Sequence, residues 1–240
     1  MKLVIIAAGL GSRLSSVSDD TPKLLIPVLG EPLIDRLLLN CIEANIENIV
    51  VVTGFNNHII EDHLKTIKIP IKIEIAYNPD WKLANGVSVL SAKKHIPSGE
   101  DFMISMSDHY YKSDILKIIK NKSDKNAIAS VGADYKIDEI HDIDDGMKLQ
   151  IDEKSNLIHA MSKTLSKYNA IDCGIFKCKY EFFDYLIKAK EKNECSLSDA
   201  CNLLMDKNLM GSVDIKNYPW IDIDTPEALD FINQNPENFI

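Results

Sequence analysis

Apolar and polar positions divide the first half of the chain into two alternating kinds of segment. Short runs rich in apolar residues predict buried strands, and they cover residues 3–6, 49–52, 71–76 and 102–106. Between these runs, apolar residues recur every three or four positions, which is the spacing of one face of a helix. Repeated alternation of this kind predicts a parallel sheet with helices on both of its faces.

The pattern changes after about residue 126, where strand-like runs follow one another with little helix between them. The elements expected after that point are four strands, two helices, a strand and a last helix, at residues 127–133, 147–151, 157–161, 171–178, 180–190, 197–206, 212–215 and from 226 onwards. Because no repeat or low-complexity linker interrupts the chain, residues 1–240 are predicted to form one domain with two halves, 1–125 and 126–240.

Charge and hydropathy narrow the classes of function. The chain has 240 residues, of which 45% are hydrophobic, and a formal net charge of −9. A general nucleic-acid surface would be basic, so we expect no nucleic-acid partner, although a local cluster of cations is enough to bind a nucleotide. No apolar run approaches the roughly 20 residues that span a bilayer, and we expect no membrane insertion.

The cysteines and the start of the chain indicate a cellular compartment. There are 5 cysteines and no Cys-x-x-Cys pair, which argues against a disulfide framework and favours reduced thiols. The chain begins directly in a strand-like run with no secretory leader, so we expect a cytoplasmic protein. The oligomeric state stays open, with a homodimer as one option.

A glycine-containing loop follows the first strand-like run, with the sequence AAGLGSR at residues 7–13. Its small residues leave backbone N–H groups accessible, and Gly9 and Gly11 allow those groups to converge on phosphate oxygens. Arg13 and Lys23 bring two cations to the same end of the sheet. These features predict a site for a nucleoside triphosphate.

Two commoner glycine motifs are excluded for this loop. A dinucleotide-binding fingerprint needs a third glycine where this chain has Leu14, and a P-loop needs Gly-Lys-Ser/Thr where this chain has Gly11-Ser12-Arg13. An ordinary strand-to-helix turn with solvated cations is the remaining alternative, and the loop by itself does not exclude it.

Three aspartates follow other strand-like runs, namely Asp108 after the fourth run and Asp222 and Asp224 after the last extended piece. Ligands of such sheets bind beyond the carboxyl ends of the strands, so one crevice can collect all three side chains. Carboxylates suit Mg²⁺, which offsets charge when a phosphate is attacked. The structural alternatives are that Asp108 caps a turn and that Asp224 or Thr225 caps the last helix.

Two polar features receive no catalytic role from the sequence. His109 is interpreted as a packed loop histidine rather than a catalytic base, and the other histidines lack the spacing of metal ligands. Residues 134–145 include six acidic side chains and are interpreted as a solvated surface loop, with a lid as the alternative.

Five short motifs occur in a recognisable order: residues 7–13 with Thr21-Pro22-Lys23, NGVS at 85–88, SDHY at 107–110, IDCGIF at 171–176 and WIDIDT at 220–225. Together they resemble the motifs of nucleotidyltransferases that activate sugar phosphates and phospho-alcohols. Inositol-1-phosphate cytidylyltransferases look closest, and phosphocholine cytidylyltransferases look similar. The resemblance implies an α/β fold of the nucleotide-diphospho-sugar transferase type, with a mixed, mostly parallel, Rossmann-like central sheet flanked by helices.

The resemblance also implies an activity: Mg²⁺-dependent transfer of CMP from CTP to a phosphorylated small-molecule acceptor, with release of pyrophosphate. The first half of the chain would bind the nucleotide and the second half the acceptor. The implied roles are nucleotide binding for Ala8, Gly9, Gly11, Asn85, Gly86 and Ser88, catalytic cations at Arg13 and Lys23, acceptor binding for Lys163, Asp172 and Gly174, and Mg²⁺ ligation by Asp108 with Asp222 or Asp224.

Departures from the family pattern leave the substrates open. Cys173 stands where relatives often carry Thr, and Val87 stands where an aromatic residue is common in the cytidylyl branch. A sugar-1-phosphate uridylyl- or thymidylyltransferase is the nearest alternative. A nucleotide-binding regulator without activity is an alternative of another class, which the full set of cations and carboxylates argues against. Because the chain ends soon after its last helix, we expect no fused membrane synthase domain.

Overall fold

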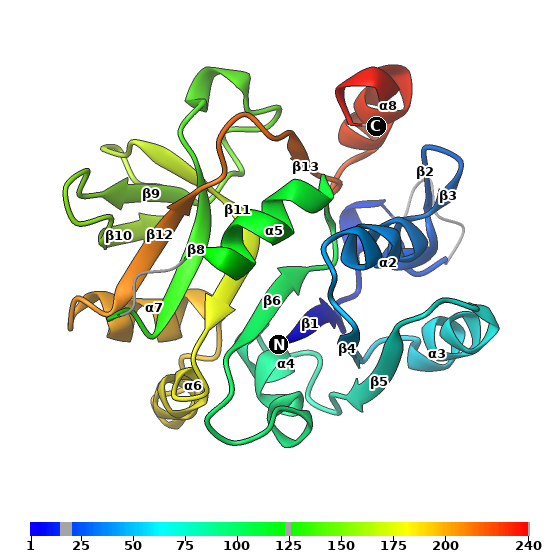
Figure 1. Ribbon diagram of the computed structural model, residues 1–240, viewed down its shortest axis with the longest axis horizontal. Helices are drawn as coiled ribbons and strands as arrows, with labels where there is room; N and C mark the ends of the chain where they lie inside the picture. Colours follow the sequence, from blue (N-terminus) through cyan, green and yellow to red (C-terminus); the bar gives the residue numbers. More distant parts are fainter. Residues whose placement is uncertain (15–20, 123–125, 240) are drawn as a thin grey trace.

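A nine-stranded mixed sheet forms the centre of the protein, for which a computed structural model describes residues 1–14, 21–122 and 126–239. The strand order is β10-β9-β11-β6-β1-β4-β5; in addition, β8 pairs with β11, and β12 pairs with β8 (Figure 1). The strands are β1 (Lys2–Ala7), β4 (Asn48–Thr53), β5 (Lys72–Tyr77), β6 (Phe102–Met106), β8 (Ala129–Asp134), β9 (Lys148–Ile151), β10 (Ile158–Ser162), β11 (Ala170–Cys178) and β12 (Met210–Asp214).

Most strands of this sheet run in one direction. β1 pairs in parallel with β4 and β6, and β4 pairs in parallel with β5. Of the nine described strands, only β11 and β10 run against the rest, because β11 is antiparallel to β6, β8 and β9 and β10 is antiparallel to β9. The mixed, mostly parallel sheet expected from the sequence is therefore confirmed.

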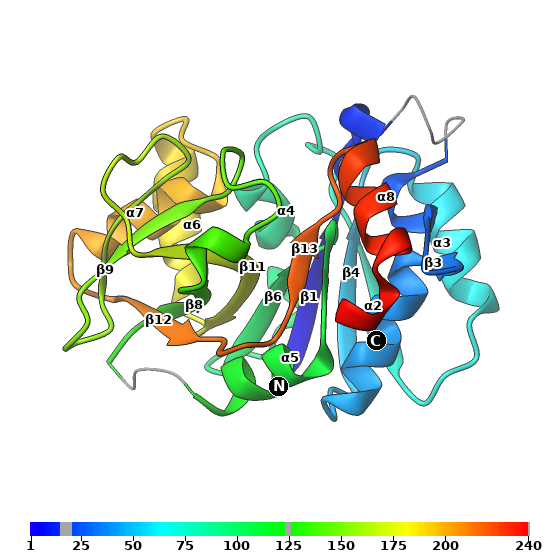
Figure 2. The same cartoon turned by 90° about the horizontal axis from the view of Figure 1, so that it is seen from above.

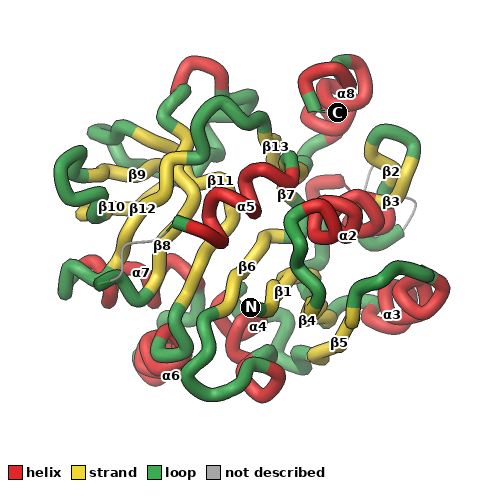
Figure 3. Tube along the Cα trace, in the orientation of Figure 1, coloured by secondary structure: helices red, strands yellow, loops and turns green. Residues whose placement is uncertain are grey.

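Helices cover both faces of the sheet, as Figures 1 and 3 show. They are, on one face, α2 (Leu33–Glu43), α3 (Asn57–Thr66), α5 (Ser113–Asn121) and α8 (Pro226–Gln234), and on the other, α4 (Gly86–Ser91), α6 (Phe182–Glu191) and α7 (Leu197–Met205). A hydrophobic core lies on each face of the sheet: the first core packs against α2, α3, α5 and α8, and the second core against α4, α6 and α7. Side chains alternate along β1, so that Leu3 and Ile5 enter the first core and Val4 and Ile6 enter the second core. An apolar run without alternating polarity therefore fits a strand buried on both faces.

A small two-stranded sheet lies apart from the main one. β7 (His109–Tyr111) follows β6, and β13 (Trp220–Asp222) pairs with it in antiparallel register, with Asp222 opposite His109. Figure 2 shows β13, drawn in orange, returning alongside the middle of the molecule before α8. This pairing carries the last acidic segment back to the end of β6. A second pair, β2 (Pro27–Val28) and β3 (Glu31–Pro32), forms a short hairpin before α2.

Helix α5 has no counterpart among the elements expected from the sequence. It spans nine residues, and its buried residues Ile115, Leu116 and Ile119 share one face at helical spacing. The segment is short and directly follows β7, so its pattern is easily taken for the end of a strand region. Among the described residues, no helix combines the length and the apolar character needed to cross a membrane.

A pair of leucines in α2 tests the assignment of the first core. Leu37 is fully buried, whereas Leu39 on the same helix is 44% exposed. Leu37→Ala should lower the free energy of unfolding by about 2 to 5 kcal/mol, because it leaves a cavity between the helix and the sheet. Leu39→Ala should change it by less than about 0.5 kcal/mol. Urea unfolding of both variants measures the difference, and equal losses would contradict this packing.

Candidate functional site

Two adjoining cavities lie beyond the carboxyl ends of β1 and β6. The first cavity, of about 290 Å³, is lined by residues of the loop after β1, including Gly9 and Gly11, and by Lys23 and Ser88. The second cavity, of about 280 Å³, is lined mainly from the other half of the chain and includes Met161, Lys163, Asp172, Phe176 and Trp220. Five residues line both cavities, namely Arg13, Asn85, Met106, Asp108 and Asp224. The predicted crevice is thus a pair of cavities with a shared wall.

The loop after β1 needs a glycine at position 11. Gly11 has a φ of +65°, and a Cβ there would lie 2.9 Å from the Cβ of Lys23. The short 3₁₀ turn at Ser12–Leu14 begins directly afterwards, which brings Arg13 to the wall of both cavities. Ala8, by contrast, lines neither cavity: its carbonyl accepts a hydrogen bond from the backbone N–H of Phe55 at 3.1 Å.

The segment after Trp220 places two aspartates by simple alternation. Ile221 and Ile223 enter the first core, so Asp222 and Asp224 face the opposite way, toward the cavities. The backbone N–H of Ile223 donates to the carbonyl oxygen of Asp108 at 2.8 Å. The three aspartates are therefore held at one place by main-chain bonds.

Thr225, not Asp224, caps the last helix. The hydroxyl of Thr225 accepts a hydrogen bond from the backbone N–H of Ala228 at 3.2 Å, at the start of α8. Of the two cap candidates that the sequence offered, only the threonine bonds to the helix. The carboxylate of Asp224 is therefore left to the cations of the site.

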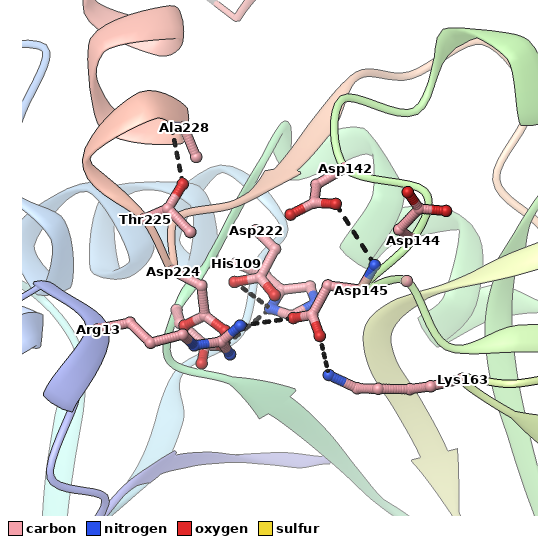
Figure 4. A network of polar contacts seen from close by, with 12 residues as sticks. Arg13, His109, Asp142, Asp144, Asp145, Lys163, Asp222, Asp224, Thr225 and Ala228 are labelled. Atoms are coloured by element: carbon pink, nitrogen blue, oxygen red, sulfur yellow. Dashed lines mark hydrogen bonds and ion pairs between the residues drawn. The ribbon is translucent and has the colours of Figure 1, made fainter.

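Cations and carboxylates form one network at the shared wall (Figure 4). Arg13 and Lys23 both contact the carboxylate of Asp224. Lys23 Nζ also lies 3.2 Å from Asp108 Oδ2, and Arg13 Nη1 lies 2.7 Å from Asp145 Oδ2. The hydrogen bond with Asp145 raises the pKa of Arg13. The structure thus joins Arg13 and Lys23 to Asp108 and Asp224, and Asp222 lies beside these two aspartates.

His109 lies between Asp108 and Asp222. Its Nδ1 lies 2.8 Å from Asp108 Oδ1 and 3.9 Å from Asp222 Oδ1, and its ring stacks on Trp220 with centroids 5.4 Å apart. Burial lowers the pKa of His109, but the neighbouring charges of Asp222 and Asp108 outweigh burial and raise it to about 9. The interpretation as a packed histidine agrees with the stacking, and its contact with two site carboxylates was not foreseen.

Strand β11 brings Asp172 and Gly174 to the second cavity through an irregularity in its pairing with β8. The backbone N–H of Gly174 donates to Asp172 Oδ1 at 2.6 Å, while burial raises the pKa of Asp172 to about 6. Gly174 has a φ of +77°, and a Cβ there would lie 2.5 Å from His109 Cδ2. Glycine is required because the histidine ring occupies that space.

The acidic residues fit a divalent cation. Asp108, His109 and Asp222 offer donor atoms within 4.8 Å of one another, and so do Asp145, Asp222 and Asp224. Among the described residues, Asp222 Oδ1 is one of two buried side-chain polar atoms without a hydrogen-bond partner. A buried carboxylate oxygen of this kind is expected to find a partner, and oxygen ligands are those that Mg²⁺ prefers.

The predicted nucleotide-binding segment at residues 85–88 divides into three positions with different surroundings. The hydroxyl of Ser88, on the first cavity, accepts a hydrogen bond from Asn78 at 3.0 Å. Asn85 lines both cavities, and its Oδ1 accepts the backbone N–H of Leu197 at 2.8 Å. Gly86 lines neither cavity, and a Cβ there would lie 2.6 Å from the carbonyl oxygen of Cys195. Because glycine has no side chain, the two backbone segments can pack closely at Gly86.

One residue of the network was missed by the sequence analysis. Asp145 belongs to the acidic run that was interpreted as a solvated loop, yet it contacts Arg13 and also Lys163, whose Nζ lies 2.7 Å from Asp145 Oδ1. The only signal in the sequence is its place at the end of the run, immediately before Gly146 and the strand β9.

The amino-acid sequence of residues 2–238 matches the model of a protein family, the nucleotidyl transferases. This chain belongs to the nucleotidyl transferase family. The match covers nearly all described elements, from β1 to the residues that follow α8. The family expected from the five motifs is therefore confirmed.

Curated relatives and a solved structure agree with this family. The bifunctional protein GlmU of Methanococcus aeolicus is 31% identical over 94% of this chain and 52% of its own length. The bifunctional IPC transferase and DIPP synthase of Rubrobacter xylanophilus is 27% identical over 94% of this chain and 49% of its own. The chain thus spans about half the length of these relatives. The inositol-1-phosphate CTP transferase from T. maritima shares the fold, with a TM-score of 0.87, 21% identity, and coverage of 99% of this chain and 95% of the other.

Two glycines with a positive φ test the contact between His109 and β11. Gly99 has a φ of +80° with open space around it, whereas Gly174 has a similar φ and faces the histidine ring. Gly99→Ala should cost about 1 kcal/mol of unfolding free energy through backbone strain alone. Gly174→Ala should cost about 1 to 3 kcal/mol more, because the added methyl overpacks the site. Chemical denaturation compares the two variants, and the contact with the histidine ring is refuted if the costs are equal.

Proposed function

We propose that this protein transfers CMP from CTP to the phosphate of a small phosphorylated alcohol or sugar, for example inositol 1-phosphate. The products are a CDP-linked compound and pyrophosphate. The observation that carries the proposal is the meeting of Arg13 and Lys23 with Asp108, Asp222 and Asp224 at the wall between two cavities. Each cavity would hold one substrate, and the charged groups would lie where the two substrates react.

The nucleotide is proposed to bind in the first cavity, formed mainly by the half at residues 1–125. Gly9 and Gly11 line this cavity and would present backbone N–H groups to the triphosphate. Arg13 and Lys23 would stabilise the negative charge of the leaving pyrophosphate. The base and ribose would lie toward Ser88 and Asn85, with Ala8 and Gly86 shaping the backbone behind them.

The carboxylates are proposed to hold Mg²⁺, with Asp108 and either Asp222 or Asp224 as ligands. When bound, Mg²⁺ neutralises part of the triphosphate charge and makes the α-phosphorus more open to attack. Within the network, Lys23 contacts both Asp108 and Asp224, so it can orient these two carboxylates. His109, bonded to Asp108 and close to Asp222, would hold their spacing.

The acceptor is proposed to bind in the second cavity, formed mainly by the half at residues 126–240. Lys163 would bind the acceptor phosphate, while Asp172 and the backbone at Gly174 would border the rest of the molecule. An oxygen of the acceptor phosphate forms a bond to the α-phosphorus as the bond from that phosphorus to pyrophosphate breaks. The attacking group is already an anion, so no protein nucleophile is needed.

The choice of CTP is supported by similarity. The Rubrobacter xylanophilus relative carries the name IPC transferase, and the T. maritima protein with the same fold is an inositol-1-phosphate CTP transferase. The charged groups act on phosphates and do not distinguish bases, so they suit a sugar-1-phosphate uridylyl- or thymidylyltransferase equally well. The identity of the base therefore has to be measured.

A substrate panel tests the activity. Each of CTP, UTP, dTTP, ATP and GTP is incubated with Mg²⁺ and with inositol 1-phosphate, phosphocholine or a sugar 1-phosphate, and released pyrophosphate is measured. We expect CTP to give the fastest release with one of these acceptors. Faster release with UTP or dTTP would favour the alternative transferase. Nucleotide binding without turnover in any combination would indicate a regulator and contradict the proposal.

Asp108→Asn tests the proposed metal ligand. The variant keeps the size of the side chain but removes its charge, so Mg²⁺-dependent turnover should fall by about 100-fold or more. Asp114→Asn is a matched control, because Asp114 lies in the first turn of α5 with a side chain 40% exposed. Its turnover should stay within about twofold of the wild type. The same rate in both variants would refute the role of Asp108.

A further inference from the structure

Arg13 and Lys163 converge on the two oxygens of one carboxylate. Arg13 Nη1 lies 2.7 Å from Asp145 Oδ2, and Lys163 Nζ lies 2.7 Å from Asp145 Oδ1. The two cations come from opposite halves of the chain, one after β1 and the other after β10. Figure 4 shows the Asp145 carboxylate between the two side chains. An anionic group at this position is therefore within reach of both cations at once.

We propose that Asp145 is a resident counter-anion, which pairs with both Arg13 and Lys163 and competes with incoming phosphate groups for these two cations. The two cations and the space between them are called the phosphate subsite below. The ligand class is a phosphate group that carries at least two free oxygens. The inference rests on the proposed function for the source of that phosphate. The source would be the phosphate of one of the two substrates, or the diphosphate that joins the two substrates in the product.

Lys148 holds Asp145 in place through the backbone. Lys148 is only 8% exposed, and its ammonium donates to carbonyl oxygens rather than lying free in solvent. The acceptors are the carbonyls of Ile143 at 2.8 Å, Asp144 at 3.2 Å, Gly146 at 3.4 Å and Lys163 at 2.8 Å. One buried cation thus fastens the acidic loop to the segment that carries Lys163. The position of Asp145 between the two cations is built into the fold.

The ion pairs of Arg13 and Lys163 determine what an entering phosphate has to replace. Arg13 also contacts Asp224, but Asp224 shares its charge with Lys23. Asp145 is the carboxylate that joins Arg13 to Lys163, and both of those cations are about half exposed, at 51% and 49%. An entering phosphate must therefore replace two partly solvated ion pairs. Each pair of this kind is weak enough to be exchanged.

Asp145 also lies within 4.8 Å of donor atoms of Asp222 and Asp224, so service as a metal ligand is a rival role. The two roles differ in the effect of Mg²⁺. Removal of a competing anion strengthens the metal-free binding of a phosphate compound, because Lys163 loses this carboxylate and Arg13, among the described residues, keeps only Asp224. Removal of a metal ligand weakens Mg²⁺-dependent binding, so a titration in EDTA measures the competition alone.

Binding of inorganic pyrophosphate in EDTA, measured by titration calorimetry at low ionic strength, tests the proposal. Asp145→Asn removes the charge and keeps the shape, and it should bind pyrophosphate about five- to tenfold more tightly than the wild type. Asp144→Asn is the matched control, because Asp144 is the exposed neighbour in the same loop. Its affinity should stay within about twofold of the wild type. Asp145→Ser repeats the test with a smaller side chain.

A double variant tests whether the gain in pyrophosphate affinity depends on Lys163. In Asp145→Asn with Lys163→Met, the gain in pyrophosphate affinity should be largely lost, because one of the two cations is missing. Unchanged or weaker binding by both Asp145 variants would overturn the subsite, and so would the absence of measurable binding to any of the proteins. A lowered melting temperature with unchanged affinity would also overturn it. The measurement needs no turnover, so an inactive wild type would count against the proposed function and not against this result.

Discussion

The pairing of β13 with β7 is the constraint on which the site depends. Asp222 lies opposite His109 in this pair, and the next residue, Ile223, donates its N–H to the carbonyl oxygen of Asp108. Residues more than one hundred positions apart in sequence are thereby held side by side by backbone bonds. The aspartates carry like charges and would repel one another if they were free. A rigid main-chain connection is therefore needed to hold them together.

The cations of the site also reduce the cost of burying the three carboxylates. Lys23 contacts Asp108 and Asp224, and His109, with its pKa raised to about 9, lies between Asp108 and Asp222. Partly buried carboxylates are tolerated when cations and hydrogen bonds surround them. Gly174 then has to be a glycine because the histidine ring fills the space beside it. A residue that looks like part of an acceptor motif is therefore explained first by the packing of the charged centre.

Much of this arrangement follows from the sequence, but not all of it. The buried strands are evident because runs such as residues 49–52 are apolar on both faces, and the order of strands and aspartates places Asp108 at the end of β6. The cation pair of Arg13 and Lys23 was also expected. What the sequence lacks is information on long-range partners: nothing near Asp145 indicates that its partners are Arg13 and Lys163. Lys148 likewise resembles an ordinary strand lysine until the carbonyl groups around it are seen.

In the proposed reaction, an oxygen of the acceptor phosphate attacks the α-phosphorus of the nucleotide. An acceptor whose phosphate carries ¹⁸O in its free positions tests this claim, with the products analysed by mass spectrometry and ³¹P NMR after a single turnover with CTP. Attack by the acceptor oxygen leaves one ¹⁸O in the bridge of the new diphosphate and none in the released pyrophosphate. Label in the pyrophosphate, or a bridge without label, would contradict it.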